Sequence, residues 1–575
     1  MYSHLWDDMN RRKLFTEEDD KLRKNYENHG NFISRYQNLD ALEIKSDWLY
    51  IDCSFNKIKT IDNLSICENL ISLECQNNQL KNLDVSCLTQ LKSLNCSMNE
   101  LESIHGLQNC PKLISLNCYM NHLSKLDLTG LSFLENFTCE NNILQKIENI
   151  DCCHKLERIV CANNRLESLS LYNLSELVYL DCADNKLSYY NLLGLHYCNN
   201  LEKLFCQNNQ FNLLDFTHLS KLRILNCSNN ILESLNGIYY CLELEYLNFE
   251  NNSIKSIYIG SLQNLKDLRC MNNSFSNTFS LYGIEQCVNL ESLEVSYNGL
   301  YQCNLTNLNR IQTFDCRDNY FKTNQLSEHL RSWSHLEYLD CSENLLNEEL
   351  NLSYCVHLTH LYCSGNKIKN LLGLDSCKKL RNIDCSNNEL ESLSLRNKRN
   401  LLKLFCSRNE IKTLDLKHLS DIEMIDCAKN KLDSLHIDHL YNLNHLVCSD
   451  NKIPLVETRI DPKYILADPW TKIIFLDPCT IELKRKIEKL KTIQDIEEKI
   501  PICSICRSLI LYPVKNVVGS YIQTYCKECF IRWFMIEKQS KDPNTGIFVL
   551  TMMKEDALFN NLYSKQIENL YEEYF

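Results

Sequence analysis

Four cysteines near the carboxyl end of the chain have the spacing of a zinc site. Cys503 and Cys506 form one Cys-x-x-Cys pair, and Cys526 and Cys529 form a second pair 19 residues further on. Each pair can form a knuckle, and four thiolates complete the tetrahedron that a structural Zn²⁺ ion prefers. We therefore expect one structural zinc ion at these cysteines. The alternative is four reduced cysteines in a metal-free fold.

The rest of the sequence offers no comparable set of reactive side chains. We find no Ser-His-Asp or Cys-His arrangement and no glycine-rich phosphate loop, so no catalytic residue is expected. The formal net charge is −13, and lysine and arginine are dispersed, which argues against nucleic acid as a partner. No signal-peptide pattern and no membrane-length apolar run is present, so we expect a cytoplasmic or nuclear protein rather than a secreted or membrane protein.

A repeated pattern, Leu-x-Cys-x-x-Asn, positions most of the remaining residues. Its final asparagine recurs 19 times, mostly at steps of 21 or 22 residues, with steps of 24 or 25 before Asn209, Asn298 and Asn344. Each unit holds one short strand that cannot bury its apolar face alone. Stacked units are therefore expected to form a parallel sheet over a leucine core, with the asparagines in a hydrogen-bonded ladder.

This period and pattern resemble the leucine-rich-repeat family, over residues 48–455. The resemblance implies an α/β-type solenoid with a parallel β-sheet on its concave face. We divide the chain into a helical amino-terminal cap (1–47), a solenoid of about 19 repeats (48–455), a carboxyl-terminal cap and linker helix (456–499) and a terminal domain (500–575). The linker helix either packs on the solenoid or makes a homodimer contact.

Most of the 33 cysteines belong to the repeat. Seventeen stand three residues before a ladder asparagine, and Phe249 and Val295 fill the two remaining slots. A second set of eight stands eight residues before a ladder-cysteine position. Both sets are predicted to be small buried hydrophobic residues rather than a metal or redox ladder.

The residues beside the ladder cysteines are expected to face a partner on the concave sheet. Aspartate and tyrosine recur there, at Asp181, Tyr246, Asp315, Tyr338, Asp340, Tyr362, Asp384 and Asp426. Such a mildly acidic, tyrosine-dotted face suits a protein partner with basic character. The alternative is that Asp and Asn merely suit the solvated edge of each strand.

Residues 500–575 resemble the RING and U-box families of ubiquitin ligases, which implies a small α+β domain. The two cysteine pairs match the first zinc site of a RING. The second RING site would need ligands at Tyr521, Gln523, Asp542 and Thr545. Since only Asp542 can be an ordinary zinc ligand, that site resembles the metal-free U-box instead. U-box-like segments are 512–514, 523–525, 542–545 and 561–567, with Trp533 on the central helix.

The resemblance implies a ubiquitin-protein ligase. Its terminal domain would recruit a ubiquitin-charged conjugating enzyme through Ile505, Trp533 and Pro543, without a covalent intermediate, while the solenoid holds the substrate. One departure is Gly546, which stands where many active members carry Arg or Lys. Two alternatives stay open: a non-enzymatic binding scaffold with a zinc-stabilised end module, and a regulatory solenoid that controls a phosphatase or a similar enzyme.

Overall fold

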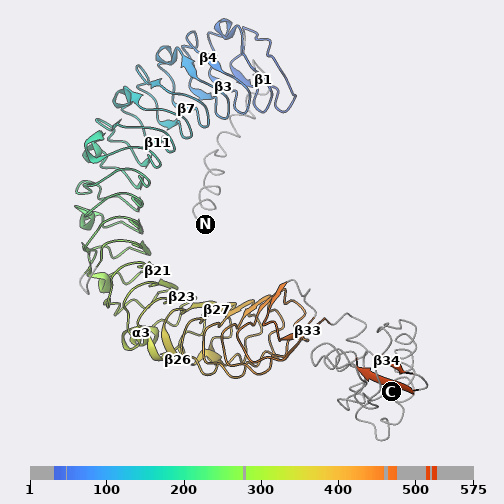
Figure 1. Ribbon diagram of the computed structural model, residues 1–575. Coiled ribbons are helices and arrows are strands. Elements are labelled where there is room, and N and C mark those ends of the chain that lie inside the picture. The colour runs from blue at the N-terminus through green and yellow to red at the C-terminus, as the bar shows by residue number, and fades with distance from the viewer. Residues whose placement is uncertain are drawn as a thin grey trace. The chain divides into compact units, whose positions relative to one another are not determined.

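The computed structural model describes residues 31–46, 48–275, 280–458, 464–475, 513–518 and 521–526 (Figure 1). The chain divides into two compact units, Met1–Leu419 and Ser420–Phe575, which we treat separately. Within the described ranges, no helix has both the length and the hydropathy that a membrane crossing requires.

One short strand per repeat builds the main sheet of the first unit, along the inner side of its curve (Figure 1). Each strand pairs in parallel with the strand of the next repeat, and equivalent positions lie in register. The strands are β1 (Asn31–Ile33), β2 (Tyr50–Asp52), β3 (Ser72–Glu74), β5 (Ser93–Asn95), β7 (Ser115–Asn117), β9 (Asn136–Thr138), β11 (Arg158–Val160), β13 (Tyr179–Asp181), β15 (Lys203–Phe205), β16 (Ile224–Asn226), β17 (Tyr246–Asn248), β19 (Asp267–Arg269), β21 (Ser292–Glu294), β22 (Thr313–Asp315), β23 (Tyr338–Asp340), β25 (His360–Tyr362), β27 (Asn382–Asp384) and β28 (Lys403–Phe405).

The other side of each repeat is made of short parallel strand pairs and single 3₁₀ turns. The pairs are β4 (Asn82–Asp84) with β6 (Ser103–His105), β8 (Leu126–Asp127) with β10 (Ile147–Glu148), β12 (Leu169–Ser170) with β14 (Leu192–Leu193), β18 (Ile257–Tyr258) with β20 (Leu281–Tyr282), and β24 (Asn347–Asn351) with β26 (Lys367–Leu372). The 3₁₀ turns are η1 (Leu64–Ile66), η2 (Leu107–Asn109), η3 (Ile150–Cys152), η4 (Tyr189–Asn191), η5 (Leu195–Tyr197), η6 (Ile238–Tyr240), η7 (Ile284–Gln286) and η8 (Leu374–Ser376). The 25-residue step between Asn319 and Asn344 accommodates helix α3 (Thr323–Leu330).

Both cysteine sets lie in the core, as the sequence predicts. Of the 28 cysteines whose side chains the structure describes, all are free thiols and only Cys87 and Cys152 are exposed. Burial raises the pKa of Cys53 and of Cys96 to about 12, so these thiols stay protonated and unreactive at neutral pH. The cysteines therefore act as small apolar residues that stack from repeat to repeat.

The ladder asparagines tie neighbouring repeats together through backbone groups. The Asn230 side-chain amide donates to the carbonyl oxygens of Cys206, Cys227 and Ser228, each at 3.1 Å, and its Oδ1 accepts the Phe211 N–H at 3.0 Å. The residue before each ladder asparagine is left-handed, with φ of 53° at Asn229. Because asparagine tolerates this conformation, the Asn-Asn pair recurs in the sequence.

The described part of the expected amino-terminal cap is an additional repeat. Strand β1 pairs in parallel with β2, and no helix occurs in residues 31–46. Tyr36 and Phe55 share the left-handed conformation, and their rings stack with centroids 4.6 Å apart. The sequence pattern missed this repeat because Ser34 and Gln37 replace the ladder cysteine and asparagine. The remainder of the predicted cap lies outside the described residues.

The second unit continues the repeat beyond residue 455. Strands β29 (Met424–Asp426), β30 (His445–Val447) and β32 (Ile465–Leu466) pair in parallel, as do β31 (Leu455–Thr458) and β33 (Lys472–Phe475). Asp468 closes the last repeat by accepting the N–H of Asp450 at 2.8 Å and of Asn451 at 3.2 Å. Separately, β34 (Pro513–Val518) and β35 (Tyr521–Cys526) form an antiparallel hairpin. The predicted linker helix lies outside the described residues.

Candidate protein-binding surface

The inner sheet of the first unit presents two columns of side chains away from the core. In β23, Leu339 is fully buried, while Tyr338 and Asp340 on either side of it point to the opposite face. The in-register pairing repeats this arrangement in every strand. The identity of the first and third residue of each strand therefore decides what the sheet can bind.

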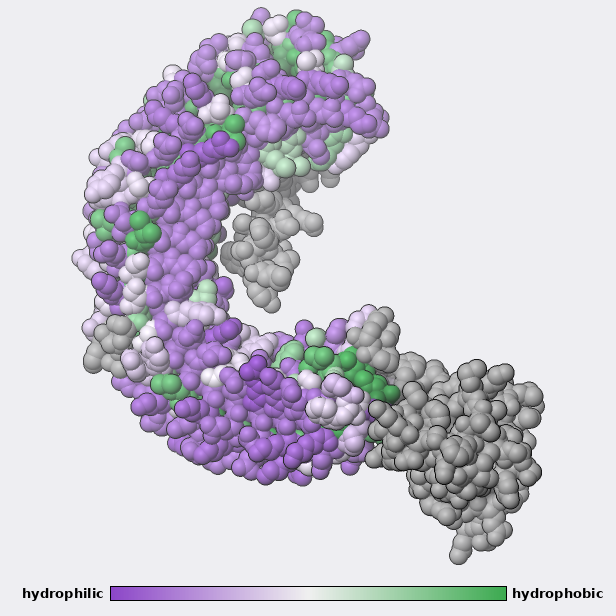
Figure 2. Space-filling view, in the orientation of Figure 1, coloured by the Kyte–Doolittle hydropathy of each residue, from purple (hydrophilic) through white to green (hydrophobic). Residues whose placement is uncertain are grey.

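A continuous acidic–aromatic patch covers seven consecutive strands of this sheet, β17 to β27. At about 4.8 Å between strands, it extends roughly 29 Å. We define the patch by Tyr246, Arg269, Glu294, Asp315, Tyr338, Asp340, His360, Tyr362 and Asp384. On the face that Figure 2 shows, hydrophilic residues dominate the first unit, and apolar ones occur in small groups.

Three carboxylates on neighbouring strands form the acidic centre of the patch. Burial, together with the charges of Asp340 and Glu294, raises the pKa of Asp315 to about 7. Burial also raises the pKa of Glu294 and of Asp340. Negative charge is therefore held here at a free-energy cost, and a cation placed beside these groups would relieve it.

Three rings lie beside the acidic centre. The ring centroids of Tyr338, His360 and Tyr362 are 5.6 to 6.3 Å apart in all three pairings. Burial, reinforced by Asp340 and Asp315, raises the pKa of Tyr338, while burial and Arg381 lower the pKa of His360. These shifts favour the neutral forms of Tyr338 and His360, and the three rings offer π faces next to carboxylates.

Arg269 marks the other end of the acidic centre. Its guanidinium lies 3.1 Å from Asp267 and 3.8 Å from Glu294, and 5.7 Å from the centroid of the Tyr246 ring. This arginine neutralises part of the charge on β19 and β21. The acidity beyond the reach of Arg269 therefore centres on β22 and β23, at Asp315 and Asp340, where Arg317 offsets part of the Asp340 charge.

The aspartates also have a local structural role. One side-chain oxygen accepts the backbone N–H two residues further on, from Arg317 to Asp315 at 3.0 Å and from Ser342 to Asp340 at 2.9 Å. This turn gives a physical reason for the recurrence of Asp and Asn in the column. The turn occupies only one oxygen of each carboxylate. The aspartates can therefore both form the turn and face a binding partner.

The structure brings together six of the eight residues expected on this face: Tyr246, Asp315, Tyr338, Asp340, Tyr362 and Asp384. Asp181 lies on β13, three strand pairings before β17, and Asp426 lies on β29 of the second unit. The sequence reasoning missed Glu294. It precedes Val295, one of the two ladder slots without cysteine, and that position was the available signal.

The predicted zinc and conjugating-enzyme residues are not placed by the structure. Cys503, Cys506, Cys529, Ile505, Trp533 and Pro543 lie outside the described residues. Cys526 ends strand β35, and only its backbone is described. Within the described ranges, no group of three or more His, Cys, Asp or Glu side chains could hold a metal ion.

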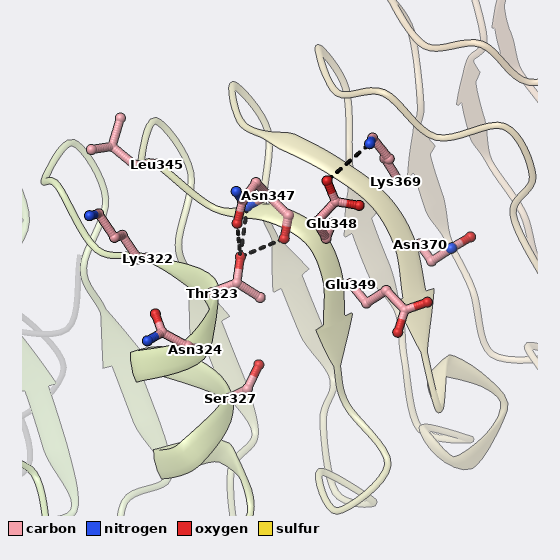
Figure 3. Close-up of a pocket in the computed structure, with 10 residues that line it drawn as sticks. All are labelled: Lys322, Thr323, Asn324, Ser327, Leu345, Asn347, Glu348, Glu349, Lys369 and Asn370. Atoms are coloured by element: carbon pink, nitrogen blue, oxygen red, sulfur yellow. Dashed lines mark hydrogen bonds and ion pairs between the residues drawn. The ribbon is translucent and has the colours of Figure 1, made fainter.

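A polar pocket of about 710 Å³ lies on the other side of the solenoid, between α3, β24 and β26 (Figure 3). Thr323 hydrogen-bonds to Asn347, and Lys369 pairs with Glu348 at 3.0 Å. These side chains satisfy one another, and the lining contains no His or Cys to act as base or nucleophile.

Comparison with known proteins supports the repeat architecture. A family model described as leucine-rich repeats in two copies matches residues 356–397. The structure is similar to YopM from Yersinia enterocolitica, with 24% identity, a TM-score of 0.56, and coverage of 78% of this chain and 88% of that one. No curated protein sequence matches the chain.

Two plant receptor structures share the fold. The ectodomain of the Arabidopsis receptor kinase GASSHO1, in complex with Casparian strip integrity factor 2, is 20% identical with a TM-score of 0.57 and coverage of 77% of this chain and 62% of that one. The Arabidopsis receptor kinase HAESA, in complex with the peptide hormone IDA and a co-receptor, is 17% identical with a TM-score of 0.53 and coverage of 78% and 93%. Together these comparisons show a leucine-rich-repeat solenoid fold, built here from repeats of about 21 residues.

Proposed function

We propose that the acidic–aromatic patch binds a protein segment that carries lysine or arginine side chains. The observation that supports this most directly is the row Glu294, Asp315 and Asp340, whose partly buried carboxyl groups lie next to the rings of Tyr338 and Tyr362. A guanidinium or ammonium group between them gains charge-assisted hydrogen bonds, worth about 1.5 to 3 kcal/mol each. Contact with a tyrosine face adds about 0.5 to 2 kcal/mol.

Two structures of similar fold agree with a binding role for such a solenoid. GASSHO1 is described in complex with Casparian strip integrity factor 2, and HAESA in complex with the peptide hormone IDA and the co-receptor SERK1. Their low identity to this chain means that only the architecture is shared. For this protein, the chemistry of the partner is therefore argued from its own patch.

A binding experiment with a model ligand tests the proposal. The full chain is titrated into a fluorescein-labelled peptide of alternating Arg and Gly-Ser units, with the matching Glu peptide as control, and anisotropy is recorded. The Asp315→Asn/Asp340→Asn variant keeps the oxygen that accepts the turn N–H and should bind the Arg peptide at least tenfold more weakly. Exposed Asp62 and Glu68, far along the solenoid, give the control Asp62→Asn/Glu68→Gln. Equal affinity of the two double variants would refute the proposal.

We further propose that residues 500–575 hold one zinc ion through Cys503, Cys506, Cys526 and Cys529 and recruit a ubiquitin-charged conjugating enzyme. The β34–β35 hairpin agrees with this, because it ends at Cys526, where the second cysteine pair begins. Zinc would brace the fold without taking part in the reaction. In the transfer, the substrate lysine amine attacks the thioester carbonyl. An isopeptide bond forms, the C–S bond breaks, and the conjugating enzyme leaves as a free thiol after taking up the proton.

Two measurements test this half of the proposal. Metal analysis of the purified chain should give one zinc, lost in the Cys503→Ser/Cys506→Ser variant. Autoubiquitination with a panel of conjugating enzymes should occur with the wild-type chain and disappear with Ile505→Ala. Bound zinc without any transfer would favour the scaffold alternative, for which Gly546 at the usual basic position is the specific indication.

A further inference from the structure

A second charged surface lies on the turn that leads into each inner strand. Two residues precede the buried apolar residue there, and in five consecutive repeats neither is acidic: Asn309–Arg310, Ser334–His335, Val356–His357, Lys378–Lys379 and Arg399–Asn400. Earlier repeats are mixed at these positions: Lys112, Lys155 and Lys221 are basic, Glu176 and Glu243 are acidic, and most of the others are neutral, so an unbroken run of Lys, Arg or His occurs only in these five repeats. We name the set Arg310, His335, His357, Lys378, Lys379 and Arg399 the basic flank. All six are exposed except the half-buried His357.

Basic side chains in the flank contact one another directly. The rings of His335 and His357 stack, with centroids 6.2 Å apart and planes at 11°. The Lys379 ammonium lies 2.9 Å from Nδ1 of His357 and donates to it. Among the described residues, none of Arg310, Lys378, Lys379 and Arg399 forms an ion pair. The flank therefore holds like charge without a counter-charge.

Neighbouring cations add to this charge. Exposed Arg396 lies three residues before Arg399. Lys398 is buried beside it, at a position where most other repeats carry leucine or cysteine, and its ammonium donates to the carbonyl oxygens of Leu374 at 2.7 Å and of Arg396 at 3.2 Å. The nearby acid Asp375 accepts a hydrogen bond from Ser394 at 2.6 Å. In a chain of net charge −13, this local excess of cations is the reverse of the overall balance.

We infer that the basic flank binds an acidic segment of a protein, rich in aspartate and glutamate. Five repeats at about 4.8 Å spacing make a strip of roughly 19 Å, which an extended segment of about six residues covers at about 3.3 Å per residue. A strip of this length is short for nucleic acid, whose backbone would also meet the net negative charge of the whole chain. The inference goes beyond the proposed function, because it assigns a partner of opposite charge to a different surface.

Anisotropy titrations of the full chain with two labelled probes test the inference: an octapeptide of Glu and Asp, and a 12-nucleotide single-stranded DNA. The wild type should bind the octapeptide, and Lys378→Glu/Lys379→Glu should weaken binding at least tenfold. The matched control, Lys125→Glu/Lys146→Glu, changes the net charge equally at exposed sites elsewhere and should bind as the wild type does. Lys378→Gln/Lys379→Gln serves as a milder variant, and circular dichroism checks the fold of each protein.

Three outcomes would overturn the inference. The first is no octapeptide binding by the wild type. The second is equal weakening by the two charge-reversal variants, which would assign the effect to overall charge. The third is DNA binding that is tighter than octapeptide binding and is lost in Lys378→Glu/Lys379→Glu, which would assign the flank to phosphates.

Discussion

Replacing one ladder asparagine should loosen one junction between repeats and leave the others intact. In Asn230→Ala, the buried Phe211 N–H loses its only side-chain acceptor, which lies 3.0 Å away, and three carbonyl oxygens lose a donor. An unsatisfied buried amide costs about 1 to 3 kcal/mol. This corresponds to roughly a 5- to 150-fold faster exchange of the Phe211 amide hydrogen, if the junction opens locally.

Hydrogen–deuterium exchange resolved by peptide measures this effect directly. A peptide that contains Phe211 should lose protection in Asn230→Ala. A peptide that contains Leu123, whose N–H is bonded to Asn142 at 2.9 Å, should exchange as in the wild type, because contacts join only neighbouring repeats. The control Asn69→Ala removes an exposed asparagine and should change neither peptide. Unchanged protection at Phe211, or equal loss at Leu123, would refute the view of the ladder as a local tie.

Three further outcomes are expected. The folded pKa of Asp315 is about 7 and lies above its unfolded value of 3.8, so its contribution to stability is complete below pH 4 and is lost as the pH rises through 7. The free energies of unfolding of the wild type and Asp315→Asn, measured by denaturation, should therefore diverge between pH 4 and 7 by at most about 1.4 kcal/mol per pH unit. Lys398→Leu removes a buried ammonium whose pKa is lowered by burial, so the melting temperature should rise, and a fall would contradict this reading. Brief treatment of the native protein with iodoacetamide, followed by peptide mapping, should label Cys87 and Cys152 but not Cys75 or Cys118, which should react only after denaturation.

The repeat could be predicted from the sequence because every unit places the same residue types at the same structural positions. Leu, Cys and Asn recur at fixed offsets, so the buried strand centre, the stacked thiol and the ladder followed from spacing alone. The two ends were harder. At the amino end Gln37 stands at the ladder position and its side-chain amide donates to the Arg35 carbonyl oxygen, and at the carboxyl end Asp468 accepts the Asp450 N–H, so the Cys/Asn pattern stopped one unit short on each side.

The candidate surface was partly predictable for a different reason. The column of residues could be read from the alternation of the strands, but the position of its acidic centre could not. That centre depends on which carboxylates lie side by side and how deeply each is buried, as the pKa of Asp315 illustrates. The Asx-type turn was also hidden, since the recurrence of Asp and Asn was visible in the sequence but the backbone geometry that places the N–H two residues further on was not.

The nearest-neighbour ladder has a mechanical consequence. Because each repeat contacts only its neighbours, tension along the stack is carried by the junctions in series. The junctions are built alike, so each extends by a similar small amount and the first unit deforms elastically along its whole length. A partner that spans β17 to β27 would clamp seven of these strands together. Binding would therefore stiffen the repeats from β17 to β27, and further extension would occur in the repeats on either side.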